Sequence, residues 1–290
     1  MLVRYCIIAT MLWASIGQLH AAEAGPRAYK NVPVGINVLQ LYYKSSETDG
    51  ASLNLKSDVE LIRYFRYFDF FGNVAAIGGY LPYANAKLSI PALNFSQSVS
   101  GMADPLLLFG FDFYGAPALS VDEYKGWEQN TILGFSLQVS LPLGEYDKTS
   151  ALNLGTNRWV FKPELAISHQ LGTSGLYVES YLNYHLFTKN REYLGNLIRD
   201  QEGKWGVDAH LVYEFMKGSF LSLDCLYAWG GETKINGVLQ GDDIRTTTMG
   251  ATLKLTFSRN MAAEFKFRDD VDAKNSDKTR SFLMKLQYLW

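Results

Sequence analysis

Charged side chains recur at every second position of several otherwise apolar segments, and these residues are the best candidates for chemistry. Between residues 158 and 168, Lys162 and Glu164 alternate with Phe161 and Leu165. A period of two places successive side chains on opposite faces of a β-strand, so the charges share one face. This face has to meet water or carry paired charges, because an isolated charge is costly in apolar surroundings. The pattern therefore predicts strands with one apolar and one polar face.

If the strands enclose a space, the polar faces line it and could contact a small solute. The candidates for solute contact are Asp104, Arg158, Lys162, Glu164, His185, Asp208, His210, Lys254, Glu264 and Lys266. Further residues assigned to the same lining are Lys56, Asp58, Glu60, Arg66, Asp112, Glu179, Asp224 and Lys285. Because both signs are present, an alternative stays open, in which the charges pair across neighbouring strands and simply fill the interior.

Histidine is the residue that would indicate a hydrolase. A serine nucleophile needs a histidine base beside it, oriented by a third polar group. Ser168 and His169 are adjacent, so on a strand they point to opposite faces and cannot form a dyad. His185 and His210 are expected to face inward on adjacent strands as polar lining. No catalytic residue, metal site or cofactor is therefore expected.

The elements that position these residues are twelve predicted strands, separated by turn signals. They cover residues 36–44, 53–68, 74–83, 102–114, 131–141, 158–170, 176–187, 205–215, 220–229, 245–258, 261–268 and 281–290. Long polar connections, such as 84–100 and 142–157, alternate with tight turns, such as 172–175. The connection 115–129 is an exception, with room for a short helix at 120–125. Alternation of long loops and tight turns is typical of outer-membrane β-barrels.

The last ten residues support a closed barrel. An apolar residue occupies every second position: Phe282, Met284, Leu286, Tyr288 and Trp290. The final strand of such a barrel pairs with the first strand, and its terminal aromatic residue lies in the interfacial girdle. We expect this face to contact outer-membrane lipid and to be recognised by the barrel-assembly machinery. The alternative is an edge strand of a soluble β-sandwich. Other aromatic residues at strand ends, Tyr42 among them, are expected in the girdles.

Composition and the N-terminal residues indicate in which cell compartment the protein is expected. The 290 residues are 48% hydrophobic and 14% aromatic, with a mean hydropathy of −0.07, as expected when half of each strand faces lipid. A net charge of −2 gives no indication of a nucleic-acid partner. Residues 1–22 resemble a secretory signal peptide, with Arg4 before an apolar core. Residues 23–34 are then an N-terminal periplasmic lead-in, and residues 35–290 form the barrel.

Several motifs are shared with a known family. They are residues 101–105 (GMADP), 141–147 (LPLGEYD), 153–159 (NLGTNRW) and 230–233 (GGET). With them, residues 35–290 resemble the family named for the MetA pathway of phenol degradation. That resemblance implies an outer-membrane barrel for aromatic or other hydrophobic small molecules. Asp104 and Arg158, from two of the motifs, could form an ion pair near the outer rim, or could each be purely structural.

The leading hypothesis is thus an outer-membrane channel that takes up small hydrophobic or aromatic compounds, as in phenol-degradation pathways. Two other classes stay open. One is an outer-membrane hydrolase of the phospholipase type, which would depend on His185 or His210. The other is a structural or adhesive barrel whose outer loops bind a partner.

Overall fold

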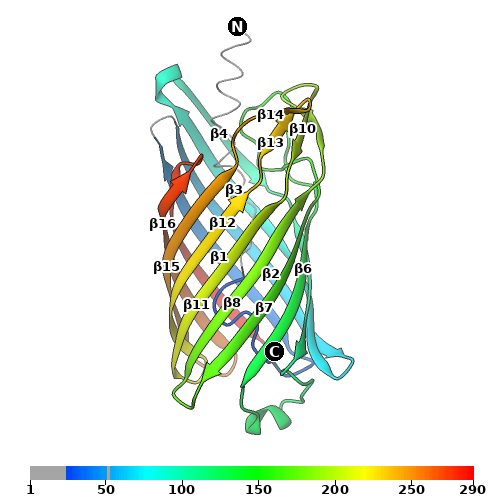
Figure 1. Ribbon diagram of the computed structural model, residues 1–290. Coiled ribbons are helices and arrows are strands. Elements are labelled where there is room, and N and C mark those ends of the chain that lie inside the picture. Colours follow the sequence, from blue (N-terminus) through cyan, green and yellow to red (C-terminus); the bar gives the residue numbers. More distant parts are fainter. Residues whose placement is uncertain (1–23, 51–52) are drawn as a thin grey trace.

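The computed structural model describes residues 24–50 and 53–290, which form an all-β, closed, twelve-stranded antiparallel barrel (Figure 1). The predicted signal peptide lies outside the described residues. The wall consists of β1 (Asn37–Asp49), β2 (Asn54–Phe70), β3 (Asn73–Ile90), β5 (Leu106–Tyr114), β6 (Thr131–Ser140), β7 (Val160–Leu171), β8 (Leu176–Phe187), β11 (Lys204–Met216), β12 (Ser219–Gly230), β15 (Ile244–Thr256), β16 (Met261–Lys274) and β17 (Lys278–Leu289). No helix in the described ranges is long and apolar enough to cross a bilayer.

The barrel closes where β1 and β17 pair in register from Val38 opposite Leu289 to Asp49 opposite Lys278. At the end of this seam, the Asn37 amide donates to the Trp290 carbonyl (2.8 Å), and the Trp290 amide donates back (3.1 Å). The predicted pairing of the last strand with the first is confirmed. We call the end of the barrel that carries Trp290 the turn end, and the opposite end the loop end.

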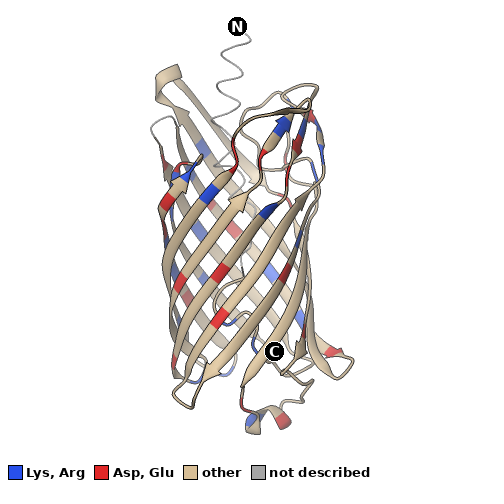
Figure 2. Cartoon of the chain, in the orientation of Figure 1, with Lys and Arg blue, Asp and Glu red and all other residues tan. Residues whose placement is uncertain are grey.

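The outer face of the wall is apolar, as the alternation predicts. On β7, Leu165 and Ile167 are exposed on the outside, whereas Lys162 and Glu164 are buried inside. Charged positions on the strands stand isolated among uncharged ones (Figure 2). Aromatic residues pack near both ends of the strands, for example Trp205 on Trp229 near the loop end (ring centroids 6.2 Å apart). This arrangement fits a bilayer around the barrel.

A charge introduced on the outer face is expected to destabilise the barrel. Leu223, on β12, is 60% exposed and faces outward. Leu223→Arg should lower the free energy of unfolding by about 2–4 kcal/mol, because an arginine near the bilayer midplane is poorly solvated. Urea titration of tryptophan fluorescence in lipid vesicles measures this. Leu143→Arg is the matched control, because Leu143 is 70% exposed in a connection outside the wall. Equal stability of the two variants would contradict a lipid-facing Leu223.

One predicted loop is wrong. Residues 84–100 were expected to be a polar connection, but β3 continues to Ile90, turns through η2 (Pro91–Leu93) and returns as β4 (Phe95–Met102). The resulting hairpin projects beyond the neighbouring strands at the loop end (Figure 1). Its inner face is apolar and packs against the connection after β6, through Leu88, Leu152 and Leu154 among others. This packing explains why a polar stretch forms strand.

The inward face predicted for β2 is also wrong over its first half. Leu55, Val59 and Leu61 line the interior, whereas Lys56 and Glu60 are exposed on the outside. Lys56 forms an ion pair with Glu47 of β1 there, and Asp58 accepts a hydrogen bond from Tyr43 (2.9 Å). Arg66, near the turn end, is exposed as well. At the strand ends, water reaches the outer face, so charges are tolerated on it.

Two long connections at the loop end contain a second, four-stranded sheet. It is formed by β9 (Asn190–Tyr193), β10 (Leu197–Gln201), β13 (Thr233–Ile235) and β14 (Val238–Leu239). At the turn end, the 3₁₀ helix η3 (Glu123–Gly126) occupies the place of the short helix expected at 120–125. Ser120, which precedes η3, and Glu123, its first residue, exchange hydrogen bonds, and those that Ser120 donates hold the pKa of Glu123 below its ordinary value.

Candidate solute channel

The segment before β1 lies inside the barrel, which differs from the periplasmic lead-in expected for it. Arg27, Tyr29 and Asn31 are buried among side chains of the wall. We call residues 24–34 the inner segment. It fills the side of the interior next to β6, β7 and β8.

Arg27 anchors the inner segment to β8. Its backbone amide donates to Glu179 Oε2 (2.7 Å), and its guanidinium lies 3.3 Å from Glu179 Oε1 and 3.7 Å from the centre of the Tyr177 ring. Ser168 and Tyr181 also donate to the Glu179 carboxylate, each at 2.7 Å. Glu179 is fully buried, so this network replaces the water that the charges have lost.

Tyr29 forms the second anchor. Its hydroxyl donates to Glu164 Oε1 (2.9 Å) and lies 2.8 Å from Ser136 Oγ, and its ring packs on Tyr181 at 5.1 Å between centroids. Lys162 Nζ lies 3.0 Å from Glu164 Oε2. Of these two candidates for solute contact, Glu164 binds the inner segment and Lys162 is its ion-pair partner.

A cavity of about 330 Å³ lies between the inner segment and the wall of β1, β2 and β15–β17. It extends from Thr48 and Thr279, near the loop end, to Val38 and Leu289, near the turn end. Apolar side chains line it at several levels, among them Leu61, Leu106, Phe220 and Leu283. The cavity can therefore hold a small molecule with an apolar body.

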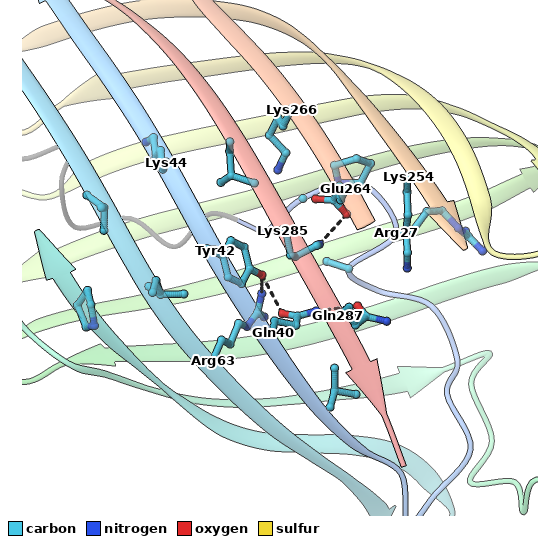
Figure 3. A pocket seen from close by; sticks show the side chains of 18 of the residues that line it. Arg27, Gln40, Tyr42, Lys44, Arg63, Lys254, Glu264, Lys266, Lys285 and Gln287 are labelled. Atoms are coloured by element: carbon cyan, nitrogen blue, oxygen red, sulfur yellow. Dashed lines mark hydrogen bonds and ion pairs between the residues drawn. The ribbon is translucent and has the colours of Figure 1, made fainter. Parts of the chain in front are cut away.

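Hydrogen bonds join β1, β2 and β17 across the cavity wall near the turn end (Figure 3). Arg63 donates to the Tyr42 hydroxyl (2.9 Å), Tyr42 donates to Gln40 (2.8 Å), and Gln40 donates to Gln287 (2.8 Å). Tyr42 thus lines the cavity instead of the girdle. Beyond this network, Val38, Phe65, Tyr80 and Leu106 form an apolar cluster.

Among the described residues, neither His185 nor His210 has a serine hydroxyl at hydrogen-bond distance. His210 Nδ1 lies 2.7 Å from Asp224 Oδ1, but Ser222 and Thr252 also donate to Asp224, each at 2.6 Å. His210 Nε2, where a serine nucleophile would bind, has no hydrogen-bond partner among the described residues. His185 stacks on Phe187 nearer the loop end and lies opposite Lys204. This arrangement is a buried polar network and does not activate a hydroxyl.

Three of the shared motifs, 101–105, 141–147 and 153–159, meet at the loop end around Asp104. This 2%-exposed carboxylate accepts hydrogen bonds from the backbone amides of Gly144 (2.9 Å) and Thr156 (2.8 Å) and from the Thr156 hydroxyl (2.5 Å). A Cβ on Gly144 would lie 2.7 Å from the backbone of Asp104, so only glycine fits without a shift. Asp104 thus ties the connection 141–159 into the mouth of the barrel.

The ion pair between Arg158 and Asp104, one of the two alternatives that the sequence left open, is not formed. The Arg158 guanidinium donates to Gln201 (2.6 Å) and lies 4.4 Å from the centre of the Phe187 ring. Within the same connection, the backbone amide and hydroxyl of Thr149 both donate to Asp147 (2.8 Å), which holds the pKa of that carboxylate below its ordinary value. The whole connection is therefore an ordered structure.

Replacing Asp104 with alanine should release this connection. Two backbone amides and a hydroxyl would lose their acceptor, at about 1–3 kcal/mol for each buried group that stays unsatisfied. We expect trypsin to cleave faster after Lys148, an exposed residue of the connection, as followed by mass spectrometry. Asp122→Ala, at an exposed aspartate near η3, is the control. An unchanged cleavage rate in Asp104→Ala would show that other contacts hold the connection.

Four of the ten candidate site residues border the cavity: Asp104, Lys254, Glu264 and Lys266. The others lie on the side of the interior that the inner segment fills, or near the loop end of the barrel on that side: Arg158, Lys162, Glu164, His185, Asp208 and His210. Residues that border the cavity but were not among the candidates are Arg27, Lys30, Gln40, Tyr42, Lys44, Arg63 and Arg268. The strict alternation of β16 already places Arg268 on the inward face. The inner segment shows no periodicity that could reveal its place.

A closed barrel with an apolar outside and a polar, partly filled inside defines the fold class of outer-membrane channels. Within this class, the chain belongs to the family described as "Putative MetA-pathway of phenol degradation", which matches residues 37–285. This confirms the resemblance seen in the motifs. A search of curated proteins finds no match.

Solved structures agree with the fold. An outer-membrane channel from Pseudomonas putida F1 is 23% identical, with a TM-score of 0.81, over 92% of this chain and 100% of that one. The β domain of the Bordetella autotransporter BrkA is 10% identical, with a TM-score of 0.54, over 89% of this chain and 100% of that one. The transport unit of the Escherichia coli autotransporter AIDA-I is 10% identical, with a TM-score of 0.50, over 98% and 97%.

Proposed function

We propose that this protein is an outer-membrane channel that takes up small hydrophobic or aromatic compounds. The observation that carries the proposal is the cavity beside the inner segment, where apolar side chains such as Leu61, Phe220 and Leu283 alternate with polar ones. Family membership and the similarity to a protein described as an outer-membrane channel support it. The enclosed volume of about 330 Å³ fits a small molecule and excludes a folded chain.

In this proposal the chain is exported by its signal peptide and reaches the outer membrane. The barrel-assembly machinery recognises the apolar outer face of β17 and the residue after it, where Phe282, Met284, Leu286, Tyr288 and Trp290 are exposed. The turn end then faces the periplasm and the loop end faces the exterior, as short turns and long loops do in barrels of this kind.

Growth and uptake test the proposal. A strain that lacks the gene should grow more slowly, and take up labelled compound more slowly, on one or more members of a panel of hydrophobic and aromatic carbon sources supplied at low concentration. Growth on succinate is the control, and complementation should restore the difference. Equal growth and uptake by both strains on every member of the panel would refute the proposal.

A further inference from the structure

The wall of the cavity carries a large excess of positive charge. Among the described residues that border it, only Asp104 and Glu264 are acidic. The basic ones are Arg27, Lys30, Lys44, Arg63, Lys254, Lys266, Arg268 and Lys285. This excess contrasts with the chain as a whole, whose net charge is −2. Positive charge is thus concentrated where a solute would lie.

Three of the lysines in this set lack a carboxylate partner among the residues that the structure describes. Lys285 Nζ lies 2.6 Å from Glu264 Oε2, and Arg27 is paired with Glu179. By contrast, Lys44, Lys254 and Lys266 have no carboxylate oxygen within 4.0 Å of their Nζ atoms in residues 24–50 and 53–290. Lys254 and Lys266 are each only 8% exposed, so little water compensates their charges.

The strand register combines these charges with apolar contacts. Lys266 lies opposite Leu283, and Leu283 lies opposite Lys44, so one apolar side chain stands between two lysines. Val59 of β2 continues the same row. Figure 3 shows Lys44, Lys266 and Lys285 on three adjacent strands, and all three border the same cavity. A ligand there meets ammonium groups and aliphatic surface together.

We infer that the cavity selects amphipathic organic anions, in particular small aromatic carboxylates and sulfonates. The anionic group binds between Lys44 and Lys266, and the apolar body lies along Leu283 and Val59. An anion compensates ammonium charges that the described residues leave without carboxylates, whereas a neutral analogue gains nothing from them and a cation is repelled. The inference rests on the proposed function, because it takes this cavity as part of the solute's path.

Equilibrium dialysis tests the binding step. Benzenesulfonate and benzenesulfonamide have nearly the same shape and differ in charge at neutral pH. With the purified mature protein in a neutral detergent, we expect the sulfonate to bind about tenfold more tightly, which corresponds to about 1.4 kcal/mol. Phenyltrimethylammonium should bind more weakly than both. Equal affinities for the sulfonate and the sulfonamide would overturn the inference.

A double variant locates the effect. Lys44→Gln with Lys266→Gln keeps a polar side chain, about one bond shorter, that can donate hydrogen bonds, but removes both charges, so the preference for benzenesulfonate should disappear. Lys56→Gln is the matched control, because Lys56 lies on the outer face. Heat-modified gel mobility verifies that each barrel is folded. A preference that persists in the double variant would place the anion elsewhere and overturn the inference.

Swelling of liposomes that contain the protein separates this inference from the proposed function. We expect entry of benzenesulfonate to exceed that of benzenesulfonamide in the wild-type protein but not in the double variant. If neither compound enters while the binding preference holds, the channel proposal fails and the anion site stands. If both enter equally and bind equally, the channel stands and anion selection fails.

Discussion

Tyr29→Ala is expected to convert the narrow barrel into a leaky one. Tyr29 is 7% exposed, and its ring and hydroxyl hold the inner segment against β6, β7 and β8. Truncation of a buried aromatic residue costs about 3–5 kcal/mol, and here the loss falls on the docking of this segment. The undocked state should then become at least about a hundredfold more populated. Conductance in planar bilayers, together with the rate of liposome swelling in arabinose, measures the opening.

Tyr29→Phe is the control for this experiment. It keeps the packing on Tyr181 and loses only the hydrogen bonds to Glu164 and Ser136, so its conductance should lie between those of the wild type and Tyr29→Ala. An unchanged conductance in Tyr29→Ala would show that the inner segment is not the barrier to passage.

Glu179→Ala should cause the largest loss of stability. The carboxylate is fully buried and accepts hydrogen bonds from Arg27, Ser168 and Tyr181. Its removal leaves the Arg27 guanidinium buried beside β8 without its closest counter-charge. Breaking one half of a buried ion pair costs about 3–5 kcal/mol. Urea-induced unfolding in lipid vesicles measures this loss, with Glu128→Ala, at an exposed glutamate, as control.

A double-mutant cycle tests the cause. Arg27→Ala combined with Glu179→Ala removes both charges, so the double variant should be more stable than Glu179→Ala alone. If the two losses simply add, the ion pair is not the source of the instability, and the packing of the glutamate side chain has to explain it.

The wall of the barrel could be predicted from the sequence, because lipid on the outside requires apolar residues and the interior accepts polar and charged ones. On β6 and β7, for example, Phe135 and Leu165 face outward while Ser136 and Glu164 face inward. A one-residue error in register would expose charges to lipid, so the alternation identifies the faces securely. The long outer connections, in contrast, had to be left without structure, because their strands are very short and one of the pairings, β10 with β13, joins two different connections.

The rule that charged side chains face the interior failed for β2, because it assumes that lipid surrounds the whole length of the strand. Lys56, Asp58 and Glu60 were assigned to the interior only because charges are excluded from lipid. The strands continue beyond the apolar belt, and there Lys56 can pair with Glu47 in water. Strand length, and not charge alone, decides where the rule applies.

The wall residues that face the filled half of the interior could be predicted from the sequence, but the place of the inner segment could not. Glu164 and Glu179 could be placed on inward faces, yet nothing in residues 24–34 identifies Tyr29 and Arg27 as their partners. These contacts join residues more than a hundred positions apart, and the segment has no secondary structure that would give it a period. The only indication in the sequence is a surplus of inward carboxylates over inward basic residues on β7 and β8, which implies that a hydrogen-bond donor has to come from elsewhere in the chain.

The position of the inner segment constrains the order of assembly. The seam joins the first wall strand, β1, to the last, β17, so the cylinder cannot be sealed until the whole chain has been delivered to the membrane. Residues 24–34 directly precede β1. They either take their place before β1 and β17 pair, or they have to enter a barrel that is already closed. We therefore expect a half-open sheet, folded around its own leading residues, to precede the native state.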